Sequence, residues 1–199
     1  MKTIISLICS ILLISCSTSK MEKNVVNELL KNQLIKSPYI KVVMKEPVQT
    51  LVSLEYYEKA YQDKNIRLGD MIRIRPESNP PFTWPIDSLE IKKLKEKYKK
   101  DTISQLWKKN NFHGSKLKLA NARDIKNFKS HLSKRYFGDE GIAISKPIMT
   151  SDKEFVLIFY KTFTLGKYSN HPRQKAILMQ NKDGSWRIKE IYDDPNVIY

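Results

Sequence analysis

The chain of 199 residues carries a net charge of +15, and 41% of its residues are hydrophobic and 29% are charged. This composition excludes a disordered chain and indicates a globular protein of one domain whose basic surface attracts anions. The surface is a poor match for nucleic acid, because Arg, whose planar guanidinium suits base and phosphate recognition, supplies only 7 of the 36 basic side chains.

An apolar run from Ile4 to Ile14 follows the positively charged start of the chain. Its length suits the ~7–15 residues of a signal-peptide core and falls short of the ~20 residues of a transmembrane helix. The stretch that follows, Leu13-Ile14-Ser15-Cys16, resembles the lipobox of bacterial lipoproteins at all four positions. The resemblance implies that residues 1–15 are a cleaved signal peptide and that Cys16 carries the acyl chains of a membrane anchor. A conventional secretory signal or a short buried helix is the alternative.

The other cysteine, Cys9, lies within the segment that cleavage would remove. The mature chain would then have no intramolecular disulfide and no cysteine-based metal site. Ser17 stands where enterobacterial lipoproteins retained in the inner membrane have Asp, and the next residues lack the acidic cluster of surface-displayed Bacteroidota-type lipoproteins. The resemblance therefore implies a periplasmic location on the outer membrane.

After cleavage, we expect a short lipidated tether, residues 16–23, followed by a single α+β domain, residues 24–199. An apolar stripe at helical spacing predicts an amphipathic helix over residues 24–36: Val25, Val26, Leu29, Leu30 and Leu34. Its position beside the anchor suggests a membrane-lying or partner-binding helix. It lacks the Trp or Phe of interfacial helices, however, which favours packing on its own core.

The middle of the chain predicts a mixture of strands and helices. A strand is expected over 39–44, a helix within 48–61, and, from alternation, a strand from Met71 to Arg75. A proline-rich loop precedes a helix over 87–100, with Asp87 and Glu90 as its capping box. A second apolar turn of Ile103, Leu106 and Trp107, a strand over 116–120 and a helix over 124–138 follow.

Four strands in an antiparallel meander are predicted at the end of the chain: residues 142–148, 155–163, 175–180 and 186–192. Asn181 to Gly184 form a tight hairpin turn between the last two. This region, from ISKPIMTSDKEFVLIFY to NKDGSWRIKEI, resembles the C-terminal part of small lipoproteins of Bacteroidota-type bacteria. The resemblance covers about the last third of the chain and implies a fold but no activity. We expect helices packed on a C-terminal antiparallel β-meander.

Few residues suggest catalysis. The histidines His113, His131 and His171 lack metal-ligand spacing, and no nucleophile motif or phosphate-binding loop is present. We therefore expect no cofactor and no metal, and the sequence favours a protein that is not an enzyme. His171 and Arg173, in the loop YSNHPRQ, form a candidate loop site.

A lysine-rich stretch on the helix over 87–100 is the candidate contact for anions: Lys92, Lys93, Lys95, Lys97, Lys99 and Lys100. The alternative is the solvated side of an amphipathic helix. The leading hypothesis is a lipid-anchored cell-envelope protein that binds an anionic lipid, a polysaccharide or a protein without catalysis. An envelope hydrolase with a site assembled from distant residues and an immunity-type protective lipoprotein are the alternatives.

Overall fold

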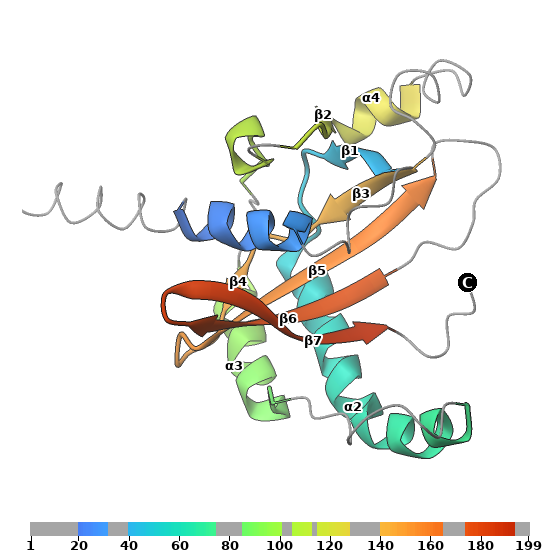
Figure 1. The fold of residues 1–199 in the computed structure, drawn as a ribbon, viewed down its shortest axis with the longest axis vertical. Helices are drawn as coiled ribbons and strands as arrows, with labels where there is room; N and C mark the ends of the chain where they lie inside the picture. The colour runs from blue at the N-terminus through green and yellow to red at the C-terminus, as the bar shows by residue number, and fades with distance from the viewer. Residues whose placement is uncertain are drawn as a thin grey trace, which may run out of the picture.

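The structure is a computed structural model that describes residues 20–31, 40–74, 85–100, 105–112, 115–127, 140–164 and 174–193, with residues 63–74, 126–127 and 193 described by backbone alone. Within these ranges a seven-stranded sheet has the order β2-β1-β3-β5-β6-β7, and β4 pairs with β5 (Figure 1). The strands are β1 (Ile40–Met44), β2 (Lys118–Ala120), β3 (Glu140–Ile144), β4 (Ile148–Met149), β5 (Phe155–Thr164), β6 (Gln174–Lys182) and β7 (Ser185–Asp193).

Helices lie on both faces of the sheet (Figure 1). They are the helical segment 20–31, α2 (Thr50–Ile74), α3 (Ser88–Tyr98), the short α4 (Ala122–Asn127) and the 3-10 helix η1 (Lys109–Phe112). The predicted α+β class and the antiparallel meander of β3, β5, β6 and β7 are confirmed. The sheet is not limited to the C-terminal part of the chain, because β1 pairs in parallel with both β2 and β3.

The central strands are buried on both sides. In β5, Val156 and Ile158 face helix 20–31 and the segment around Trp107, whereas Leu157 faces α2 and α3. A strand with two covered faces needs apolar residues at every position, because neither face is in contact with water. This explains the continuous apolar run of β5, which differs from the alternating pattern of a strand with one solvated face.

Helix 20–31 packs on the core, as the sequence favoured. Val25, Val26 and Leu29 are fully buried against the sheet, and Met21 packs beside them. The helical residues include Lys20 to Lys23, so the predicted tether is wrong over its last four positions. The described fold therefore begins at Lys20.

α2 corrects a second prediction. The helix expected within 48–61 is present but continues to Ile74, so the predicted strand from Met71 is wrong. A helix that has already formed extends by one hydrogen bond per residue, and a five-residue alternation does not outweigh that continuation when no proline interrupts it. The apolar turn predicted from Ile103, Leu106 and Trp107 is only partly described: residues 105–108 have no regular structure and Leu106 is exposed, whereas Trp107 is buried in the core.

The hairpin between β6 and β7 is confirmed. Asp183 and Gly184 both have positive φ, at 52° and 76°, and Lys182 pairs with Ser185 across them. Two central residues with positive φ form the turn whose twist matches that of the flanking strands. A register irregularity follows between Leu178 and Met179 of β6, where β7 carries one extra residue.

Candidate functional site

Several predicted site residues lie outside the described ranges. Cys16, His171 and Arg173 are among them, as are the two other histidines. The ends of β5 and β6 that flank residues 165–173 pair at Lys161 and Gln174, at the opposite end of the sheet from the β6–β7 hairpin. The loop site and the lipid-attachment residue therefore remain predictions.

The predicted basic helix is α3. Its N-cap, Asp87, accepts a hydrogen bond from the Glu90 N–H at 2.7 Å, and Ile91 and Leu94 are buried against α2. All six lysines are described, and five of them are exposed: Lys92, Lys93, Lys97, Lys99 and Lys100. The helix is amphipathic, with its lysines on the solvated side.

Neighbouring groups engage some of these lysines. The Lys95 ammonium lies 2.6 Å from a Glu58 carboxylate oxygen of α2 and is half-buried. Lys99 lies 3.9 Å from Glu96 in an exposed pair, and the Lys97 ammonium is 5.1 Å from the centre of the Tyr98 ring. Three of the six lysines thus have a neighbouring partner group, and the anion contact of α3 remains a prediction.

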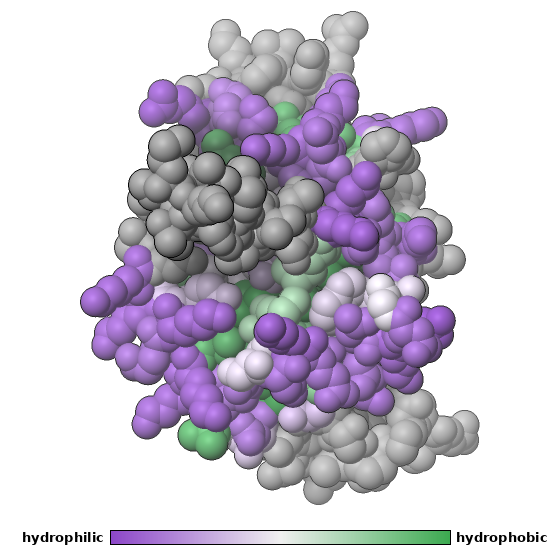
Figure 2. All heavy atoms as spheres, turned by 90° about the vertical axis from the view of Figure 1, so that its left-hand side faces the viewer, coloured by the Kyte–Doolittle hydropathy of each residue, from purple (hydrophilic) through white to green (hydrophobic). Residues whose placement is uncertain are grey.

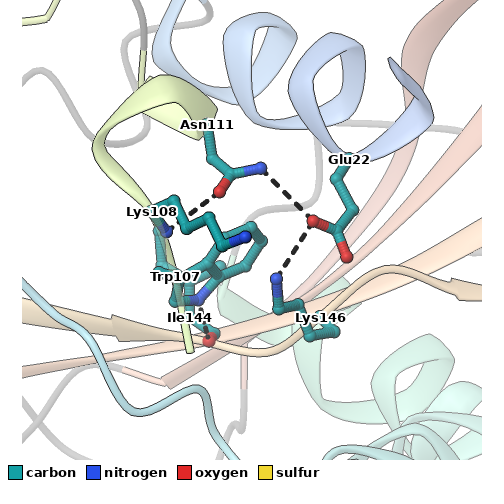
Figure 3. A network of polar contacts seen from close by, with 6 residues as sticks. All are labelled: Glu22, Trp107, Lys108, Asn111, Ile144 and Lys146. Atoms are coloured by element: carbon teal, nitrogen blue, oxygen red, sulfur yellow. Dashed lines mark hydrogen bonds and ion pairs between the residues drawn. The ribbon is translucent and has the colours of Figure 1, made fainter. Parts of the chain in front are cut away.

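A second cluster of polar side chains joins helix 20–31 to the end of β3 (Figure 3). One carboxylate oxygen of Glu22 accepts hydrogen bonds from the Lys146 ammonium at 3.0 Å and from the Asn111 side-chain amide at 3.2 Å. The side chains of Lys146 and Glu22 are only 18% and 14% exposed. We call Glu22, Asn111, Trp107 and Lys146 the Glu22 cluster.

The Trp107 ring packs against the Lys146 ammonium in the Glu22 cluster. Its indole N–H donates to the Ile144 carbonyl at 3.0 Å, and the Lys146 ammonium lies 3.9 Å from the centre of its ring. Asn111 also accepts a hydrogen bond from the Lys108 backbone N–H at 3.0 Å. In Figure 3 the Lys108 side chain extends over Trp107 toward the same space as Lys146. A carboxylate and an aromatic ring thus compensate the partly buried cation.

This arrangement holds elements together and has no visible catalytic chemistry. Each polar group of the Glu22 cluster contacts a partner from another segment: helix 20–31, the stretch 105–112, or the residues between β3 and β4. No nucleophile in the cluster faces a base, as a covalent mechanism would require. Sequence reasoning missed the cluster, because Glu22 was placed in the tether and its partner Lys146 is 124 positions away.

Tyr57 is the most deeply buried ionisable group with a shifted pKa. Its hydroxyl accepts a hydrogen bond from the Ile158 N–H at 2.7 Å and contacts the carbonyl oxygens of Ile158 and Ile177. Burial raises the pKa of the Tyr57 phenol well above its usual value. A neutral phenol in this place links α2 to β5 and β6.

Burial also raises the pKa of the Glu190 carboxyl, and the positive charge of Lys189 partly offsets this increase. Across the part of the chain that the structure describes, no group of three or more His, Cys, Asp or Glu residues could hold a metal ion. Within the same ranges, no helix is long and apolar enough to cross a membrane.

Comparison with known proteins adds no relative. No protein-family model matches the chain, and neither a curated protein nor a solved structure does.

Proposed function

We propose that this chain is a lipid-anchored protein of the bacterial cell envelope, acylated at Cys16, on the periplasmic face of the outer membrane, whose domain binds a partner without catalysis. The proposal rests first on the lipobox pattern of Leu13-Ile14-Ser15-Cys16. The two or three acyl chains implied by this pattern would anchor the protein stably, whereas a single chain binds a membrane only marginally.

The packing of helix 20–31, which follows the lipobox closely, supports the proposal. Helix 20–31 buries Val25, Val26 and Leu29 against the sheet, with Met21 beside them. Cleavage before Cys16 would remove none of the described residues and would leave three residues between the lipidated cysteine and Lys20. The predicted processing site is thus compatible with an intact folded domain immediately after the anchor.

A binding role is favoured by what the described polar residues do. The Glu22 cluster connects three segments, and the Lys95–Glu58 pair connects α3 to α2. Each of these arrangements is accounted for by packing, which leaves the basic surface as the feature available to a partner. The full chain has a charge of +15, of which cleavage would remove only Lys2, and such a charge attracts anionic envelope components.

The test is the intact mass and membrane fractionation of the native protein beside Cys16→Ala. We expect the native protein to lack residues 1–15, to carry acyl mass and to sediment with membranes, and the variant to do none of these. Cys9→Ala is the matched control, because it replaces the other cysteine and should be processed like the native chain. Unmodified, soluble native protein would refute the proposal.

A further inference from the structure

We propose that the domain rests on the anionic phospholipid surface to which it is anchored, and that the contact is made by the end of the sheet nearest the anchor. We call the exposed lysines of this end the anchor-end lysines: Lys20, Lys23, Lys108, Lys109, Lys153 and Lys182. The inference depends on the proposed anchor at Cys16, and it names the partner and the surface.

The sheet topology places these lysines at one end. β3 ends at Ile144, which pairs with Tyr160, and Phe155 at the start of β5 pairs with Gln180 near the end of β6. The turn 151–154 and the hairpin at 183–184 therefore share an end of the sheet, and the chain after β3 runs toward this end through β4, which pairs with Leu157 and Val156. The Glu22 cluster brings the start of helix 20–31 toward this end, because Lys146 lies between β3 and β4.

The figures show this end from two directions. In Figure 1 the blue helix begins on the left, on the side where the β6–β7 hairpin turns. Figure 2 looks at that side, where most of the described surface is hydrophilic apart from a narrow apolar strip. The side on which helix 20–31 begins thus presents a largely hydrophilic surface.

The distance from the anchor is short. Four residue steps separate Cys16 from Lys20, which span at most about 14 Å even when fully extended. Charges remain effective over about 8–10 Å in physiological salt. Because Glu22 fixes the first turn of the helix to Lys146 and Asn111, the helix start cannot swing away from this end of the sheet without breaking the cluster.

The carboxylates of this end keep their negative charge, and most of them accept local hydrogen bonds. Asp152 accepts hydrogen bonds from the Thr150 hydroxyl and the Glu154 N–H, and these bonds lower the pKa of Asp152. Glu154 contacts the Gln180 amide, and Glu22 lies in its cluster, whereas Asp183 stands in the exposed hairpin turn. The anchor-end lysines thus outnumber the acidic side chains of these turns and project from exposed positions.

The test measures the acetylation rate of each lysine by peptide mass spectrometry. The acylated native protein is placed in phosphatidylcholine vesicles with or without phosphatidylglycerol. We expect the anchor-end lysines to react several-fold more slowly on the anionic vesicles, with the protection lost in high salt. Lys41 and Lys161, which are exposed near the opposite end of the sheet, should react equally on both.

Two double variants test whether the charges of these lysines cause the protection. Lys108→Gln with Lys109→Gln should reduce the protection of Lys20 and Lys23, whereas Lys41→Gln with Lys161→Gln, which removes the same charge, should not. Protection of Lys92 and Lys93 alone would assign the contact to α3 and overturn the inference, as would equal rates on both kinds of vesicle. A native protein without acyl mass would refute the proposed function and this inference with it, whereas acylated protein with unprotected lysines would refute the inference alone.

Discussion

Tyr57 shows how a single side chain connects a helix to the sheet. It comes from α2, is fully buried, and reaches the backbone of the β5–β6 pair at Ile158 and Ile177. A buried hydroxyl is tolerated only where it is hydrogen-bonded, and here it also satisfies a backbone N–H. The tyrosine therefore fixes the position of α2 on the sheet as well as filling the core.

We predict that Tyr57→Phe lowers the free energy of unfolding by about 1–3 kcal/mol, because it leaves the Ile158 N–H without the phenol oxygen in a buried site. Tyr56→Phe is the control, since Tyr56 is only partly buried and its hydroxyl donates to the Gln174 carbonyl at 3.2 Å. Urea denaturation measures both variants. Equal decreases in the free energy of unfolding of the two variants would show that burial of the Tyr57 hydroxyl does not increase its contribution.

The same substitution has a pH signature. Because the folded-state pKa of Tyr57 is raised, its stabilising effect is fully present below the unfolded pKa of about 10 and is lost as the pH rises above that value. The difference in stability between the native protein and Tyr57→Phe should therefore be constant from neutral pH to about 9 and should shrink above 10. A constant difference throughout the alkaline range would contradict this account.

At the scale of an element, hydrogen bonds at its N-terminus stabilise α3. The sequence predicted a capping box, and the structure forms half of it: the Asp87 carboxylate accepts from the Glu90 N–H at 2.7 Å. The Glu90 carboxylate does not return to Asp87 but accepts from the Ser151 N–H, also at 2.7 Å. Glu90 thus connects α3 to the turn that precedes β5.

Asp87→Ala should therefore lower the free energy of unfolding by about 1 kcal/mol, the usual effect of removing an N-cap oxygen. Asp87→Asn keeps an accepting oxygen at the same place and should restore most of the loss. Thermal or urea unfolding of the two variants gives the measurement. If both variants have the same unfolding midpoint as the native protein, the N-cap oxygen contributes nothing to stability.

Local chemistry explains which elements could be predicted from the sequence. The cap of α3, the Asp183-Gly184 turn and the apolar run of β5 each depend on residues close together in the chain. The strand predicted at Met71 is wrong because a short alternation of apolar and polar residues cannot reveal that a preceding helix continues through it. The contacts of Trp107 with Ile144 and Lys146 could not be predicted, since these partners follow it by 37 and 39 positions in the chain and lie at the end of another strand.

For the molecule as a whole, the Glu22 cluster is the connection that the sequence could not reveal. It brings together positions 22, 111 and 146 from three separate segments, and none of them carries a local motif that names its partner. Through these contacts, the first described turn of the chain is fixed to the sheet. A force applied through an anchor at Cys16 would therefore act on the whole domain rather than on a free helix.

A double-mutant cycle of Glu22→Gln and Lys146→Met tests this connection. We expect a coupling energy of about 1–3 kcal/mol, because the two charges are mostly buried and lie 3.0 Å apart. The exposed Lys99–Glu96 pair, 3.9 Å apart and about two-thirds exposed on each side, is the matched control and should give less than about 0.5 kcal/mol. Loss of the buried pair should also accelerate amide hydrogen exchange in helix 20–31 while β5 and β6 stay protected, because the helix is released before the sheet opens.

A coupling energy no larger than that of the surface pair, with unchanged exchange in the helix, would mean that Val25, Val26 and Leu29 hold the helix by apolar packing alone.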